Sequence, residues 1–117
     1  MAANIVGGLT QASAVLIQNQ QTGTSYSLAI TDADNRVVEL SNTSAITLTV
    51  PLNSSVPFAI GSQVQILQTN TGQVTVAPTG GVTINANPGL KLRGQWSFAT
   101  LIKRAENTWV LVGDVTA

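Results

Sequence analysis

The sequence contains no histidine and no cysteine, and these two absences remove most routes to enzymatic chemistry. Without histidine there is neither the usual general base nor the commonest metal ligand, and no serine–histidine triad can form. Without cysteine there is neither a disulfide framework nor a thiolate metal site. No serine–lysine pairing stands out, and the glycines lack the spacing of a phosphate-binding loop. We therefore expect no enzyme, no cofactor and no metal site.

Charge is also scarce, because only 9% of the residues are Asp, Glu, Lys or Arg and the formal net charge is +0. Five basic residues are too few for the electrostatic footprint of a nucleic-acid-binding protein. A neutral surface rich in Thr, Gln, Asn and Ser gives little repulsion between copies of the chain. The composition therefore favours a protein that works in an assembly with other protein chains.

Long apolar runs are absent as well. The longest are about five residues, whereas a membrane-spanning helix needs about 20. The opening MAANIVGGLTQASA has no basic segment and no continuous apolar core, so it does not have the pattern of a signal peptide. We expect no membrane contact, and synthesis in a cytoplasm without cleavage.

From residue 25 onward apolar and polar residues alternate, with the period of half-buried β-strands. Val, Ile and Thr dominate these runs, because β-branched side chains fit a pleated surface. Short strands separated by Gly, Pro and Asn turns are typical of sandwiches and barrels. We predict an all-β domain over residues 25–117, an antiparallel β-sandwich or jelly-roll-like barrel. The alternating apolar positions are Tyr26, Leu28, Ile30, Ile46, Leu48, Val50, Val64, Ile66, Val74, Val76, Val82, Ile84, Leu90 and Leu92.

Two turns between these strands are predicted in detail. Pro88-Gly89 has the composition of the central pair of a type II turn, in which the glycine supplies a positive φ. Asn70-Thr71-Gly72 has the composition of a three-residue hairpin loop with glycine at the left-handed position.

Residues 1–24 contain no charged side chain, and Gly7, Gly8 and Gly23 argue against a long regular element there. One interpretation is a frayed terminus, and the other is an extended arm that orders only against a neighbouring subunit. The segment AVLIQ, residues 14–18, is long enough for one short strand. We take residues 1–24 as an N-terminal arm.

The stretch TDADNRVVEL is the part of the chain most similar to a calcium-binding loop, with Asp32, Asp34, Asn35 and Glu39. An EF-hand loop that began at Asp32 would need Gly and Glu where this chain has Val37 and Thr43. The stretch is better interpreted as an Asx-type turn. We expect Asp32 and Asp34 to be exposed, so that nothing desolvates a carboxyl group for acid–base work.

Residues 90–114, LKLRGQWSFATLIKRAENTWVLVGD, contain both tryptophans and four of the five basic residues. Their pattern predicts a C-terminal hairpin whose two strands are joined by RAENT, with Trp96, Phe98 and Thr100 on one face. The tryptophans can fill the core or the edge of an interface, lie between subunits, or form an exposed aromatic patch that binds sugar or nucleic acid. The basic residues are expected at solvent-facing strand positions or in the loop.

The segments VVELSNTSAITLTVPLNSSVPFAIGSQVQILQTNTGQVTVAPTGGVTINA and LKLRGQWSFATLIKRAENTWVLVGD resemble a β-domain of tailed-bacteriophage virion proteins. Such domains occur in tail fibres, head fibres and capsid decoration proteins. The similarity extends from about Ser25 to Asp114. It implies a homotrimer with a structural role, and it supplies no catalytic residues.

The resemblance and the short N-terminal arm together favour a capsid decoration (cement) or head-fibre protein over a projecting fibre tip. On this hypothesis the partners are two further copies of the chain and the major capsid protein, and the location is the outside of the virion. The alternative is a tail-fibre or receptor-binding module for host recognition, with Trp96, Trp109 or Tyr26 as stacking platforms for a glycan.

Overall fold

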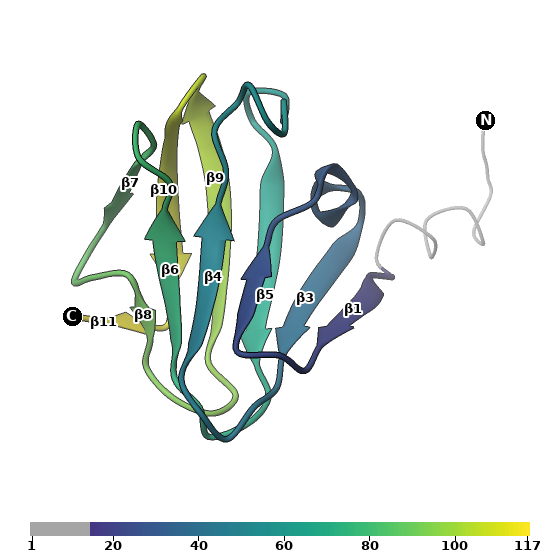
Figure 1. The fold of residues 1–117 in the computed structure, drawn as a ribbon, viewed down its shortest axis with the longest axis vertical. Coiled ribbons are helices and arrows are strands. Elements are labelled where there is room, and N and C mark those ends of the chain that lie inside the picture. Colours follow the sequence, from purple (N-terminus) through teal and green to yellow (C-terminus); the bar gives the residue numbers. More distant parts are fainter. Residues whose placement is uncertain (1–14) are drawn as a thin grey trace, which may run out of the picture.

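A computed structural model describes residues 15–117, which form eleven β-strands in two sheets and one short 3-10 helix (Figure 1). The six-stranded sheet has the order β1-β3-β5-β9-β10-β7, and the five-stranded sheet has the order β11-β8-β6-β4-β2. The elements are β1 Ile17–Gln21, β2 Ser25–Ser27, η1 Ile30–Ala33, β3 Arg36–Leu40, β4 Ile46–Val50, β5 Gln63–Gln68, β6 Val74–Pro78, β7 Thr83–Ala86, β8 Lys91–Leu92, β9 Phe98–Ala105, β10 Thr108–Gly113 and β11 Val115–Thr116.

The first six strands coil as a β-solenoid of about three turns. Each turn places one strand in the six-stranded sheet and the next strand in the five-stranded sheet. Successive turns then pair in parallel, β1 with β3 and β3 with β5 in one sheet, β2 with β4 and β4 with β6 in the other. The all-β prediction is confirmed, but the antiparallel sandwich or jelly roll is wrong, because alternation along a strand does not report the direction of its neighbours.

The C-terminal strands close the solenoid with mostly antiparallel pairing. β9 pairs antiparallel with β5 and with β10, and β8 pairs antiparallel with β6 and with β11. The predicted C-terminal hairpin is therefore confirmed, but its turn is shorter than RAENT, and Trp96 lies in the loop before β9 and not on the strand with Phe98 and Thr100. β7 is the exception, since it pairs in parallel with β10 at the far edge of the six-stranded sheet.

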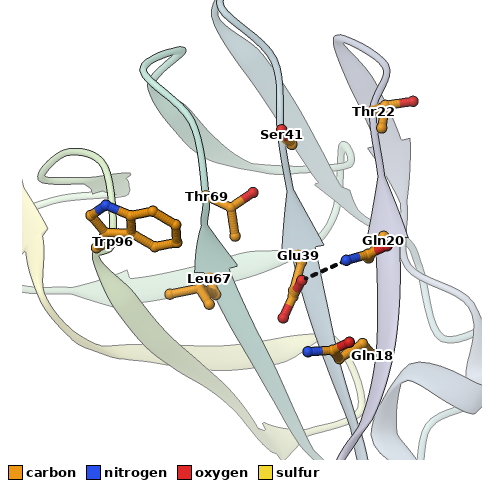
Figure 2. Close-up of a pocket in the computed structure, with 8 residues that line it drawn as sticks. All are labelled: Gln18, Gln20, Thr22, Glu39, Ser41, Leu67, Thr69 and Trp96. Atoms are coloured by element: carbon orange, nitrogen blue, oxygen red, sulfur yellow. Dashed lines mark hydrogen bonds between the residues drawn. The ribbon is translucent and has the colours of Figure 1, made fainter.

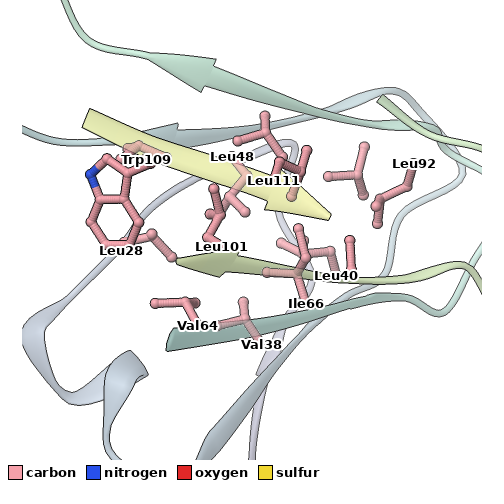
Figure 3. Close-up of a cluster of buried hydrophobic side chains, with 14 of the residues drawn as sticks. Leu28, Val38, Leu40, Leu48, Val64, Ile66, Leu92, Leu101, Trp109 and Leu111 are labelled. Atoms are coloured by element: carbon pink, nitrogen blue, oxygen red, sulfur yellow. The ribbon is translucent and has the colours of Figure 1, made fainter. Parts of the chain in front are cut away.

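The core lies between the two sheets and consists mainly of one face of β3, β4, β5, β6, β9 and β10 (Figure 3). Val38 and Ile66, which are paired in register on β3 and β5, are both fully buried, and so is Leu48 of β4. The predicted alternation thus identifies most of the core. Ile30 differs from the prediction, because β2 ends at Ser27 and Ile30 is 50% exposed in η1.

The corners between the two sheets also stack, one turn on the next. The Asn42 side chain donates to the Thr22 carbonyl oxygen (2.8 Å), and the Gly72 N–H donates to the Asn42 carbonyl oxygen (2.8 Å). The buried Gln68 side chain spans the third corner, where it accepts from Val74 N–H (3.1 Å) and donates to the Asn70 carbonyl oxygen (2.9 Å). The polar residues that predict turns therefore hydrogen-bond each turn to its neighbour.

Both detailed turn predictions are wrong. Residues 70–72 connect β5 to β6 in the other sheet, so they form a corner of the solenoid and not a hairpin loop. Gly72 lies outside the positive-φ region and is glycine for another reason: a Cβ atom there would overlap the carbonyl oxygens of Ser44 and Asn42. Gly89 likewise lies outside the positive-φ region, so Pro88-Gly89 is not the central pair of a type II turn.

The structure also describes part of the predicted N-terminal arm. Residues 1–14 lie outside the described part of the chain. Residues 17–21 form β1, which pairs in register with β3 and begins the solenoid. The ordered β-structure therefore starts before residue 25.

The stacked corners make a stability prediction. Replacement of Gly72 by Ala forces backbone of two neighbouring turns apart, and we expect it to cost about 3 kcal/mol of the free energy of unfolding. Gly80→Ala is the matched control, because no atom lies within 4 Å of a Cβ at that position and its φ is not positive. Urea unfolding should show a change of no more than about 0.5 kcal/mol for the control. A Gly72→Ala variant as stable as the control would contradict the stacking argument.

Candidate functional site

The acidic side chains of the stretch that partly matches a calcium loop have different partners in the structure. Asp34 is exposed and lies 3.8 Å from Arg36 (Oδ2 to Nη1), while Glu39 extends from β3 and accepts from Gln20 Nε2 at 3.2 Å. Among residues 15–117 no group of three His, Cys, Asp or Glu side chains is placed to hold a metal ion. Over the same residues, no helix is long and apolar enough to cross a membrane.

Asp32 contradicts the prediction of an exposed carboxylate, because it is only 1% exposed. It accepts hydrogen bonds from Tyr26 Oη (2.7 Å), Asn19 Nδ2 (2.8 Å) and Ala29 N–H (2.8 Å). Burial, followed by the hydrogen bond to Asp32, raises the pKa of Tyr26 to about 12. The three donors satisfy the carboxylate, so the cluster fixes β1, β2 and η1 to one another.

Lys103 is a second buried charged residue, and it lies beside Trp109. Lys103, expected at a solvent-facing position, is 2% exposed and donates from Nζ to Asn53 Oδ1 (2.6 Å) and to the Phe58 carbonyl oxygen (2.7 Å). Its Nζ lies 5.9 Å from the centroid of the Trp109 ring. Burial lowers the pKa of Lys103, and the charge of Glu106 opposes that shift. Lys103 therefore ties the loop between β4 and β5 to β9.

The three aromatic residues proposed as stacking platforms lie in different environments. Trp109 is 1% exposed and packs edge-on against Phe58, with ring centroids 5.3 Å apart. Tyr26 is half-buried, and its hydroxyl is bound to Asp32. Trp96 is 67% exposed. Trp96 is therefore the one of the three that can offer a ring face to a ligand.

Trp96 borders a groove of about 480 Å³ on the outer face of the six-stranded sheet, here called the Trp96 groove (Figure 2). β1 contributes Gln18 and Gln20, and β3 contributes Glu39. Parallel pairing aligns these side chains, since Gln20 is in register with Glu39. Gln20 and Glu39 therefore share one row across the sheet, and Gln18 lies two residues before Gln20 on β1.

The rest of the groove lies next to the indole ring. Leu67 is in register with Glu39 on one side and with Phe98 on the other, which extends the row toward the loop that carries Trp96. Ser41 and Thr69, just beyond the ends of β3 and β5, add two hydroxyl groups. In Figure 2 Trp96 lies at one side of the groove and the glutamines lie at the other.

The backbone holds Trp96 in a conformation that bulky residues rarely adopt, with φ +72°. Its N–H donates to the carbonyl oxygen of Gln68 at 2.6 Å. The flanking loop is tied down by Ser97, which donates to Asp114 Oδ2 (2.8 Å), and by Arg93, whose two bonds to Asp114 are 2.7 and 2.9 Å. Surrounding contacts therefore impose the strain at Trp96, and strained residues of this kind concentrate at functional sites.

The groove has groups that can bind a polar ligand. Its lining offers amides, hydroxyls, one carboxylate and one aromatic face. From the sequence we identified Trp96 as a candidate but could not group it with Gln18, Gln20 and Glu39, because that grouping depends on parallel register. The burial of Lys103 was also missed, although its place in the apolar–polar alternation of β9, two residues after Leu101, is a signal for it.

Comparison with known proteins shows no family model that matches the chain and no similar sequence among curated proteins.

The two lysines of the chain provide a direct test of the buried charge. Lys103→Ala leaves a cavity and removes the donor from Asn53 and Phe58, so we expect a loss of about 3 kcal/mol in the free energy of unfolding. Lys91→Ala, at an exposed position, should change it by no more than about 0.5 kcal/mol. Amine labelling followed by mass spectrometry should modify Lys91 and spare Lys103 in the folded protein. Equal labelling of both would show that Lys103 is accessible.

Proposed function

We propose that the chain is a structural protein of a tailed-bacteriophage virion, which assembles as a homotrimer and binds the outside of the capsid shell. The observation that carries the proposal is the edge of the six-stranded sheet at β1, whose outer side pairs with no other strand of residues 15–117. This strand, IQNQQ, has no charge and no proline, and Ile17 is 53% exposed. Edge strands of monomeric proteins usually carry charges or prolines that prevent pairing with another chain.

The distribution of charge supports assembly in a second way. Of the ten charged side chains, Asp32 and Lys103 are buried, and Asp34 with Arg36 and Arg93 with Asp114 form ion pairs. The described surface therefore has few charges that another protein would have to desolvate. Contacts to a shell would depend on apolar burial and backbone pairing, and would vary little with salt.

A decoration protein of this kind stabilises the shell by bridging neighbouring major capsid subunits. Each contact of one protomer can be weak, because a trimer binds as a multivalent unit and avidity can add a factor of ~10²–10⁴. The capsid is proposed as the partner because the sequence resembles phage virion domains. The chemistry of the β1 edge supplies the means of association.

The oligomeric state gives the first test. Light scattering should show a trimer at about micromolar concentration, and Ile17→Lys, which places a charge on the β1 edge, should weaken the trimer at least tenfold in dissociation constant, about 1.4 kcal/mol. Ile60→Lys is the matched control, because Ile60 is 68% exposed in the loop before β5, and it should leave the trimer intact. A stable wild-type monomer would contradict the proposal.

The location of the protein on the particle gives the second test. Images of intact virions should show density on the outer shell at three-fold and quasi-three-fold positions, and shells that lack the protein should rupture at lower temperature. Copies found only at the tail tip, or shells with unchanged heat resistance, would contradict the proposal and favour a role in host recognition.

A further inference from the structure

We propose that the Trp96 groove binds a neutral saccharide. This inference goes beyond shell binding and does not depend on it, because the groove uses outward side chains of β1, β3 and β5, whereas the proposed association uses the backbone edge of β1. It is based on four features of the groove: the strained and exposed Trp96, the hydrogen-bonding row beside it, the charge of the lining and the size of the hollow.

The indole of Trp96 is a preorganised apolar platform. A 67% exposed tryptophan contributes little to the core, yet the chain holds it at φ +72° through the Gln68 carbonyl and the Ser97 and Arg93 bonds to Asp114. A residue that served only to cover the surface would not need this conformation. A flat aromatic face suits a pyranose ring, whose C–H groups form an apolar face of similar size.

The side chains facing the indole suit the hydroxyl groups at the edge of such a ring. Gln18 and Gln20 supply amide donors and acceptors, Glu39 supplies carboxylate oxygens, and Thr69 supplies a hydroxyl beside the indole (Figure 2). Neighbouring strands are about 4.8 Å apart, so Gln20 and Glu39 offer polar groups at about that spacing across the groove. The 3.2 Å bond between Gln20 and Glu39 is long and can be exchanged for bonds to a ligand.

The charge of the lining selects among polar ligands. The residues that line the groove include one carboxylate, Glu39, and no lysine or arginine. Phosphorylated, sulfated and sialylated ligands would therefore meet a negative charge without a compensating cation. A neutral sugar suits this lining better than an anionic one or a nucleic acid.

The size and shape of the groove favour a small saccharide over a peptide. Its volume of about 480 Å³ lies within the roughly 300–1,000 Å³ of small-molecule sites. A peptide that extends a sheet needs an open strand edge, and a proline-rich peptide needs a groove lined by several aromatic residues. The Trp96 groove lies on a sheet face and has one aromatic residue in its lining.

Nuclear magnetic resonance on the full chain tests the proposal directly. The chain has two tryptophans, and therefore two indole N–H signals, one from the groove and one from the buried Trp109. The probes are neutral disaccharides, namely cellobiose, maltose, lactose and chitobiose, added to about 20 mM, which detects affinities in the millimolar range. We expect at least one of them to shift the Trp96 signal and to leave the Trp109 signal in place.

Variants separate binding from folding. Trp96→Gly relieves the positive φ, so its melting temperature should be no lower than that of the wild type, while its affinity should fall at least about tenfold. Trp96→Phe should retain part of the affinity, and Glu39→Gln should reduce it several-fold. Val112→Ala is the control, because Val112 is 46% exposed on β10 of the same sheet and outside the groove lining. It should leave the affinity within about twofold.

Three results would overturn the proposal. One is that none of the neutral disaccharides shifts the Trp96 signal. Another is that Trp96→Gly binds as tightly as the wild type. The third is that only sialyllactose or a proline-rich peptide, run as comparison ligands, binds at the groove.

Discussion

The parallel stacking of successive turns is the constraint on which the rest of this structure depends. To pair in parallel with the strand of the previous turn, the chain must first return to the same end of the sheet. The corners through which it returns must therefore stack as closely as the strands do. The Asn42 and Asn70 corners meet this demand with side-chain and backbone hydrogen bonds, and Gly72 meets it by having no side chain. Once the corners are fixed, the register fixes which residues share the outer face, and hence the composition of the Trp96 groove.

Buried polar groups hold the parts of the chain that strand pairing alone does not position. Asp32 joins β1, β2 and η1, and Lys103 holds the loop between β4 and β5 through Asn53 and Phe58. Each of these buried groups has partners, which keeps the cost of its desolvation low. The interior is therefore specified by a few directional bonds as well as by apolar packing.

The sequence was sufficient for the fold class but not for the topology. Alternation at Ile46, Leu48 and Val50 indicates which face of the strand is buried. It does not indicate whether the neighbouring strands run parallel or antiparallel. A repeat would have revealed the solenoid, but the turns differ in length. Val37 pairs with Gln65 and Thr47 with Thr75, both 28 positions on, while Ile17 pairs with Arg36 after 19 and Ser25 with Thr47 after 22. The candidate site was predicted only as far as Trp96, because its other members lie on strands far apart in the sequence.

The unequal turns show where this architecture can change in length. The three corners at residues 22–24, 41–45 and 69–73 are short and bonded to one another, whereas the connections on the other side span residues 28–35 and 51–62. Additional residues on that side, for example at the exposed Ser54 and Ser55, would lengthen a loop without moving any strand out of register. The side with the short corners therefore fixes the register of the strands, and the side with the long connections is where related chains can acquire new surface.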